Sequence, residues 1–148
     1  MREITASELS KILKEHEIWI ATDWKEGEKA DLSNVDLSGA NLSGIRLCEA
    51  NLCSADLSSA DLRKTDFFRA DLSEADLSEA DLRDADLRKA DLSGATLRDA
   101  DLSGAKLSDA NLRGTDLSSA FLSNVDLVKD LIGSAFLKGA DLSSAFLS

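Results

Sequence analysis

Several residue types that catalysis and metal binding commonly need are scarce in this sequence of 148 residues. His16 is the one histidine, which excludes a histidine-dependent catalytic triad and a metal site with several histidine ligands. Cys48 and Cys53 are the two cysteines, and without other Cys or His nearby they predict surface thiols instead of a zinc site. No glycine-rich phosphate loop is present. We therefore expect no enzyme activity, no cofactor and no metal.

Long apolar runs and an excess of positive charge are also missing. No stretch approaches the roughly 20 apolar residues of a membrane span, and the polar residues 1–5 lack the apolar segment of a secretory signal. The 28 acidic residues outnumber the 17 basic ones, and the formal net charge of −11 argues against direct binding to nucleic acid or to an anionic membrane. These features predict a cytoplasmic protein.

The residues that do abound are Leu, Ala and Asp, with 25, 20 and 19 copies, while proline and tyrosine are absent. From Ala30 onward the chain consists of five-residue blocks without insertion, each reading small residue, Asp or Asn, Leu, and two mostly polar residues. Residues 30–148 hold 24 blocks, the last one lacking one residue. The central position is Leu in 22 blocks and the first position is Ala in 18, and such regularity requires a geometric explanation.

Neither a helix nor a straight strand fits a period of five. In a helix successive leucines would be rotated by roughly 140°, and in a strand they would alternate between the two faces. A chain that turns once per block keeps the small residue and the Leu inside and the Asp or Asn outside. Four corners close a coil of 20 residues, and successive coils can pair at about 4.8 Å. The blocks therefore predict an all-β solenoid of about six coils.

The block pattern resembles the pentapeptide-repeat family, whose repeat is Ala, Asp or Asn, Leu and two variable positions, as in Ala75-Asp76-Leu77-Ser78-Glu79. The resemblance covers residues 30–148 and implies a right-handed quadrilateral β-helix, with the handedness coming from the family alone. Some members of the family mimic duplex DNA and bind DNA gyrase, so the resemblance also implies this function as an alternative for an acidic rod.

Residues 1–29 precede the repeats and are expected to form a capping helix and a turn. Thr5 and Glu8 fit a capping box at the start of this helix. Residues at helical spacing then form one mostly apolar face, which comprises Leu9, Ile12, Leu13, His16 and Ile20. Because the open end of a solenoid needs a cap, we expect this face to cover the first coil together with Trp19 and Trp24.

The outward second position of the blocks changes character toward the C-terminus. Up to residue 116 it is almost always Asp or Asn, whereas apolar residues take outward positions beyond it. These residues are Phe121, Val128, Leu131, Phe136 and Phe146. Because they gather at an end without a second capping helix, we expect a homodimer through the C-terminal coils, the alternative being that they fold over the end of one monomer.

Sorting the blocks by side of the rod gives two neighbouring acidic sides of formal charge −4 each, a third of −2 and a fourth of +1. The outward carboxylates of the acidic sides are Asp31, Asp71 and Asp91 on one and Asp36, Asp56, Asp76 and Asp116 on the next. Asp and Asn readily bond to backbone N–H groups at turns, which gives their regularity a structural explanation. Two acidic faces would also attract a protein that binds DNA.

The leading functional hypothesis is a non-enzymatic module that binds an unidentified protein, and the alternative is a DNA mimic that binds gyrase or another DNA-binding protein. The fourth and fifth positions of each block are free to vary and can carry recognition. The fourth side is the most varied, with Phe68 and Arg69 next to a mixed column of Arg46, Asp66, Asp86 and Lys106. Phe68 is equally consistent with one tolerated exposed aromatic residue.

Overall fold

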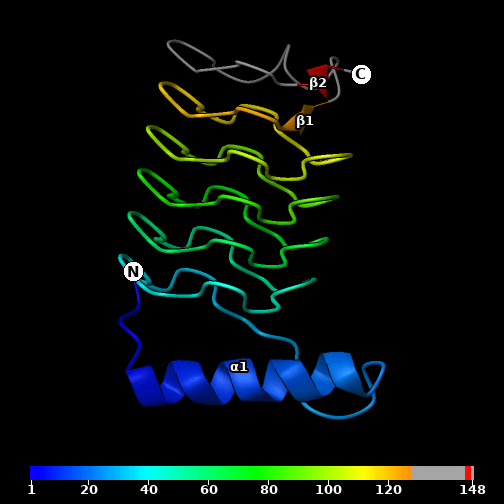
Figure 1. Ribbon diagram of the computed structural model, residues 1–148. Coiled ribbons are helices and arrows are strands. Elements are labelled where there is room, and N and C mark those ends of the chain that lie inside the picture. The colour runs from blue at the N-terminus through cyan, green and yellow to red at the C-terminus, as the bar shows by residue number, and fades with distance from the viewer. Residues whose placement is uncertain (128–145, 148) are drawn as a thin grey trace.

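The computed structural model describes residues 1–127 and 146–147. Helix α1 (Ala6–Ala21) lies across one end of a stack of coils, as Figure 1 shows. Toward the other end, β1 (Asp126–Leu127) pairs in parallel with β2 (Phe146–Leu147), with Asp126 opposite Phe146. Within the described residues no helix is both long and apolar enough to cross a lipid bilayer.

Each coil pairs with the next in a parallel register of 20 residues, as the block pattern predicts. Outward second positions form the bridges, from Asp31 with Asn51 to Asp101 with Phe121. Two kinds of backbone bond support them: the Leu72 N–H donates to the carbonyl of Asp91 in the next coil (2.7 Å), and an outward N–H donates to the preceding coil. A register of 20 residues with five-residue blocks gives the rod four sides. The last of the expected coils extends outside the described residues.

The interior of the rod consists of the first and central positions of the blocks. Leu72, Leu92 and Leu112 are each at most 1% exposed, and the alanines between them are buried as well. Full burial of one such leucine contributes roughly 1.5–3 kcal/mol, so the inward leucines dominate the stability of the rod. Thr65 and Thr115 replace alanine at inward positions, and their buried hydroxyls donate to backbone carbonyl oxygens at 2.8 Å.

Each block closes with a tight turn whose fifth residue has a positive φ. The N–H of the next block donates back to the central carbonyl, as from Ala80 to Leu77 at 3.1 Å. Glu79 in this turn has a φ of 60°, and Gly94 at the equivalent place has 69°. A positive φ confined to the third residue of a turn is the pattern of a type II turn, which favours Gly or Asn. This preference explains why the glycines of the repeats occupy the fifth position.

Helix α1 begins with the capping box at Thr5. The Glu8 N–H donates to Thr5 Oγ1 (3.2 Å), and the Thr5 N–H donates to Glu8 Oε2 (2.9 Å). Half-buried apolar residues on one face of the helix pack against the core of the coils, and these are Leu9, Ile12 and Leu13. The helix thus covers one end of the rod with the face that its sequence pattern indicates.

Two features at this end differ from the expectation. Arg2, which precedes α1, bridges Val35 in parallel: its N–H donates to the Asn34 carbonyl (2.7 Å), and its carbonyl accepts from Asp36 (2.9 Å). Trp24, expected against the first coil, is instead 63% exposed. The chain turns sharply after α1, because Asp23 and Trp24 have positive φ values of 51° and 68°, and the Trp24 ring lies beside that of Trp19.

Candidate functional site

The outward aspartates are held by the turns that follow them. Oδ1 of Asp76 accepts hydrogen bonds from the N–H (2.9 Å) and the hydroxyl (2.6 Å) of Ser78. Asp36 accepts the same pair from Ser38, at 3.0 and 2.7 Å. These bonds lower the pKa of Asp36 below its ordinary value, because the N–H and the hydroxyl of Ser38 favour the charged carboxylate. The side chain is therefore ionised at neutral pH and fixed in direction.

The structure brings the predicted acidic residues together in two neighbouring columns. The first acidic side consists of Asp31, Asn51, Asp71, Asp91 and Asn111, and the second of Asp36, Asp56, Asp76, Thr96 and Asp116. In the first column, the Asn51 and Asn111 amides donate to Asp31 (3.1 Å) and Asp91 (2.9 Å). In the second, Arg98 donates to Asp116 at 2.5 Å. Within residues 30–119 the two sides carry ten carboxylates and two arginines, so their surface is strongly negative.

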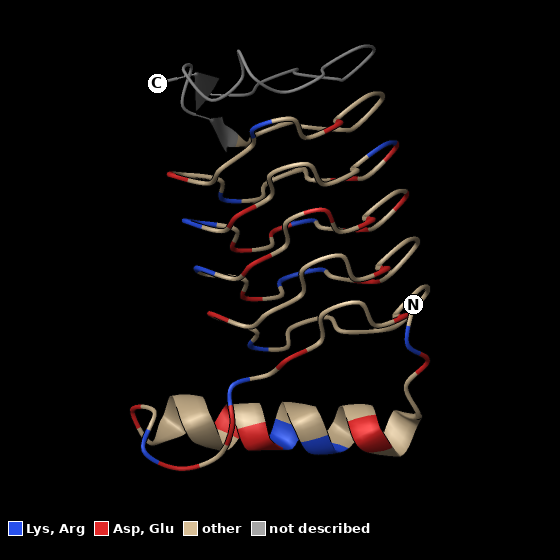
Figure 2. Ribbon diagram, turned by 180° about the vertical axis from the view of Figure 1, so that it is seen from behind, with Lys and Arg blue, Asp and Glu red and all other residues tan. Residues whose placement is uncertain are grey.

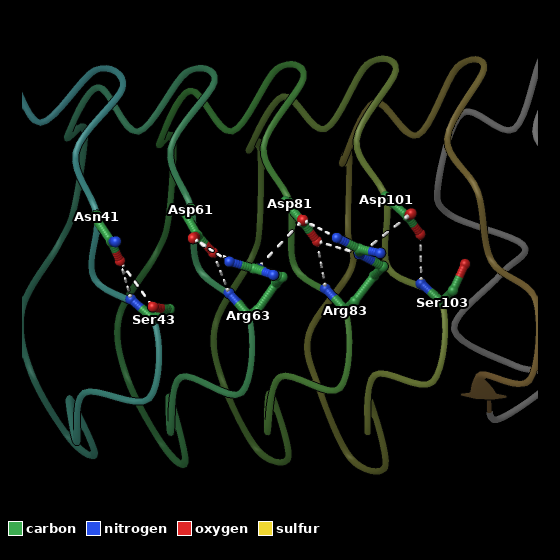
Figure 3. A network of polar contacts seen from close by, with 8 residues as sticks. All are labelled: Asn41, Ser43, Asp61, Arg63, Asp81, Arg83, Asp101 and Ser103. Atoms are coloured by element: carbon green, nitrogen blue, oxygen red, sulfur yellow. Dashed lines mark hydrogen bonds and ion pairs between the residues drawn. The ribbon is translucent and has the colours of Figure 1, made fainter.

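The third side carries a ladder of alternating carboxylates and guanidinium groups (Figure 3). Arg63 donates to both oxygens of Asp61 (2.8 and 2.6 Å) and lies 3.6 Å from Asp81 of the next coil. Arg83 repeats the arrangement with Asp81 (2.8 and 2.5 Å) and Asp101 (3.8 Å). The bond from Arg63 lowers the pKa of Asp61 to about 2. Because its charges are paired, this side offers less free charge than the acidic sides.

The fourth side gathers three cations around the ring of Phe68. The guanidinium carbons of Arg69 and Arg88 lie 5.3 and 5.6 Å from the ring centroid, and Lys89 Nζ lies 6.0 Å from it. Phe68 is half-buried and the three cations are exposed. In Figure 2, blue turns of neighbouring coils lie one above the other at one edge of the rod. Sequence analysis singled out Phe68 and Arg69 and missed the other two, although the 20-residue spacing was the signal for them.

His16 joins α1 to the first residue of the repeats. Its ring is buried, Nδ1 accepts a hydrogen bond from the Ala30 N–H (3.1 Å), and the ring stacks on Trp19 at a centroid distance of 5.5 Å. Nε2 is buried without a hydrogen-bond partner among the described residues. Burial lowers the pKa of His16, because it penalises the protonated ring. An ion pair between Glu17 and Arg46 also links α1 to the first coil.

The predicted C-terminal apolar cluster is described only in part. Phe121 is 50% exposed, and Phe146 is placed by its backbone pairing in β2. Three further members, Val128, Leu131 and Phe136, lie outside the described residues.

The two cysteines are free and half-buried, which corrects the expectation of surface thiols. Closely stacked coils crowd short side chains at the turns, and burial raises the pKa of Cys48. No cluster of three or more potential His, Cys, Asp or Glu metal ligands occurs among the residues that the structure describes.

A four-sided rod with a five-residue repeat is thus on view, and a family model described as pentapeptide repeats in eight copies matches residues 30–67, 65–104 and 97–129. The chain belongs to the pentapeptide repeat family. Among solved structures, this pentapeptide repeat protein is similar to one from the thylakoid lumen of Arabidopsis thaliana, with 36% identity and a TM-score of 0.67 over 70% of this chain and 72% of that chain.

A second similar structure is a pentapeptide repeat protein from the cyanobacterium Cyanothece 51142, with 28% identity and a TM-score of 0.53 over 81% of this chain and 89% of that chain. These likenesses imply a right-handed quadrilateral β-helix for the repeats. No curated protein matches the chain.

Proposed function

We propose that this pentapeptide repeat protein is a non-enzymatic interaction module whose rod presents fixed side chains to a protein partner. One observation carries the proposal: the fourth position changes freely while the frame does not. It is Cys53, Arg63, Phe68 and Ser73 in four different blocks, yet the turn bond that follows stays between 2.9 and 3.2 Å. Because buried residues and backbone bonds hold the coils, outward positions can serve recognition.

A capture experiment with side-specific variants tests this function. The chain is immobilised, and proteins retained from an extract of the source cells are compared with those retained by Phe68→Ala and by Asp56→Lys/Asp76→Lys. We expect a partner that is lost with the variant of one side and kept with the other. The control Glu3→Lys/Glu26→Lys makes the same charge change at exposed residues outside the repeats. Retention that is equal for all variants would contradict recognition by a side of the rod.

The alternative function, a DNA mimic that binds DNA gyrase or another DNA-binding protein, is supported by the two acidic sides. Their outward positions recur at the coil spacing of about 4.8 Å. Hydrogen bonds hold carboxylates such as Asp36 ionised and in a fixed direction, so a basic DNA-binding surface would meet ordered rows of negative charge.

A supercoiling assay with purified gyrase tests this alternative. We expect the wild-type chain to alter supercoiling when it is in excess over the enzyme. Asp56→Lys/Asp76→Lys should lose the effect, and Glu3→Lys/Glu26→Lys should keep it. If even a large excess of the wild-type chain has no effect, gyrase is not the target.

We also propose a homodimer through the C-terminal coils. The half-exposed side chain of Phe121 supports it, because large apolar groups at a surface are commonly covered by a contact. Light scattering at high concentration should give the mass of a dimer for the wild type and that of a monomer for Phe121→Ser. A monomeric wild type would exclude the dimer.

A cytoplasmic location completes the proposal. It is supported by the free thiols of Cys48 and Cys53, since unpaired cysteines are typical of reducing compartments. Fractionation of the source cells should find the chain with cytoplasmic markers, and recovery with an oxidising compartment would contradict it.

A further inference from the structure

We propose that the fourth side binds a short acidic segment of a partner protein, one that carries an aromatic or large apolar side chain between its carboxylates. The site is the cation–aromatic patch, defined as Phe68, Arg69, Arg88 and Lys89. The inference rests on the proposed function in one respect, namely that outward fourth and fifth positions carry recognition.

The patch is a fixed arrangement across two neighbouring coils. The Arg69 N–H donates to the Arg88 carbonyl at 3.1 Å, so the two turns that carry the patch are held together by their backbones. Arg69, Arg88 and Lys89 approach the ring of Phe68 within 5.3–6.0 Å, a range in which cations are attracted to an aromatic face. The ring therefore lies among three exposed cations.

Positive charge is left over in the patch after its internal ion pairs are counted. Arg88 is paired with Asp86 at 2.6 Å, and Arg69 lies 3.6 Å from Glu49 with about half of its side chain exposed. Lys89 has no ion pair among the described residues and is held near Phe68 alone. In a chain of net charge −11, this concentration of cations creates a local field of the opposite sign.

The chemistry of the patch selects an anionic partner with an apolar contact. Guanidinium groups bind carboxylates through two parallel hydrogen bonds, and the ring of Phe68 offers apolar surface between them. Aromatic and arginine side chains are also the types that contribute most to protein interfaces. An acidic peptide with an aromatic residue satisfies both requirements at once.

The surroundings of the patch favour a short peptide over a nucleic acid. Glu49 and Asp109 take the fifth position in the coils before and after the patch, so negative charge bounds it along the rod. Two coils span about 5 Å between their backbones, which matches a few residues of extended peptide at roughly 3.3 Å each. A longer polyanion would meet these carboxylates and then the acidic sides.

Fluorescence anisotropy with labelled probes tests the proposal. The probes are a Glu-Glu-Phe-Glu-Glu peptide, its Lys-Lys-Phe-Lys-Lys counterpart and a five-nucleotide thymidine oligomer. We expect the wild type to bind the acidic peptide, more weakly as salt is raised, and at least tenfold more tightly than the other two probes. Arg69→Ser/Lys89→Ser should weaken this binding at least tenfold, and Phe68→Ser should weaken it severalfold.

These variants use residues that the same positions already carry elsewhere in the rod. Serine stands at the fifth position at Ser59 and Ser119 with φ values of 55° and 61°, so circular dichroism should show an intact fold. The matched control Lys25→Ser/Arg113→Ser removes the same charge from two other exposed sites and should bind as the wild type does.

Three results would overturn the proposal: no binding of the acidic peptide, an equal loss in the control, or tighter binding of the oligonucleotide. A side-specific protein captured through another face would support the proposed function while these results refuted the patch, so the two failures are distinguishable.

Discussion

The junction between α1 and the first coil should lose stability in mild acid, because His16 is buried there in its neutral form. Nδ1 accepts a hydrogen bond from Ala30, which a protonated ring cannot do. Charged neighbours act in both directions: Glu17 favours the protonated ring, whereas Lys29 and Arg46 oppose it, and the backbone of Cys48 favours it. Burial outweighs the favourable groups and lowers the pKa of His16.

The sign and the size of the effect follow from this lowered pKa. The unfolded chain takes up a proton near pH 6.5, before the folded chain does, so the stability of the junction is complete above that pH and falls below it. If the folded ring stays neutral, the free energy of unfolding decreases by about 1.4 kcal/mol between pH 7.5 and pH 5.5. The hydrogen-bonded Asp31 and Asp36 titrate below their ordinary value of 3.8 and do not contribute in this range.

Urea denaturation followed by tryptophan fluorescence measures this change, because Trp19 stacks on His16 and Trp24 lies beside Trp19. His16→Gln is the control, since its neutral amide keeps an acceptor for the Ala30 N–H and does not titrate. We expect a drop in stability between pH 7.5 and pH 5.5 for the wild type and none for the variant. A flat profile for the wild type, or the same slope in His16→Gln, would refute the reasoning.

Other substitutions test the frame of the rod. Leu92→Ala should cost about 2–5 kcal/mol in urea denaturation, because Leu92 is fully buried; a cost below about 1 kcal/mol would contradict close packing. Thr115→Val should cost only about 1 kcal/mol in the same assay, since the Leu92 carbonyl keeps its bond from the Ala95 N–H. Glu79→Val should lower the melting temperature and Glu79→Gly should not, because β-branched residues disfavour the positive φ at this turn. Thr5→Ala should destabilise α1 by about 1 kcal/mol, seen by circular dichroism.

The repeat frame was predictable from the sequence because one geometric constraint recurs in every block. A Leu at every fifth position excludes a helix and a straight strand, and the small residue two places before it defines the inner side. Leu72, Leu92 and Leu112 are buried accordingly. The capping box at Thr5 was readable for a similar reason, since it depends on residues three positions apart.

Contacts between segments far apart in sequence were harder to predict. The bridge between Arg2 and Val35 depends on the path of the chain around α1, and no local pattern encodes it. The exposure of Trp24 follows from two consecutive residues with positive φ, which neither Asp23 nor Trp24 signals by its type. Arg88 and Lys89 reach Phe68 only through the stacking of coils, so the patch needed the register as well as the composition.

The 20-residue register has a consequence for how such a rod can be edited. Removing 20 residues shortens it by one storey and leaves every column aligned. Removing a single block, residues 70–74 for instance, turns everything beyond the cut by a quarter revolution, so that Asp76 would stand over Asn51 instead of Asp56. The leucines would stay inside in both cases. Gain or loss of one block therefore re-addresses the whole downstream surface to a different side while the core is untouched.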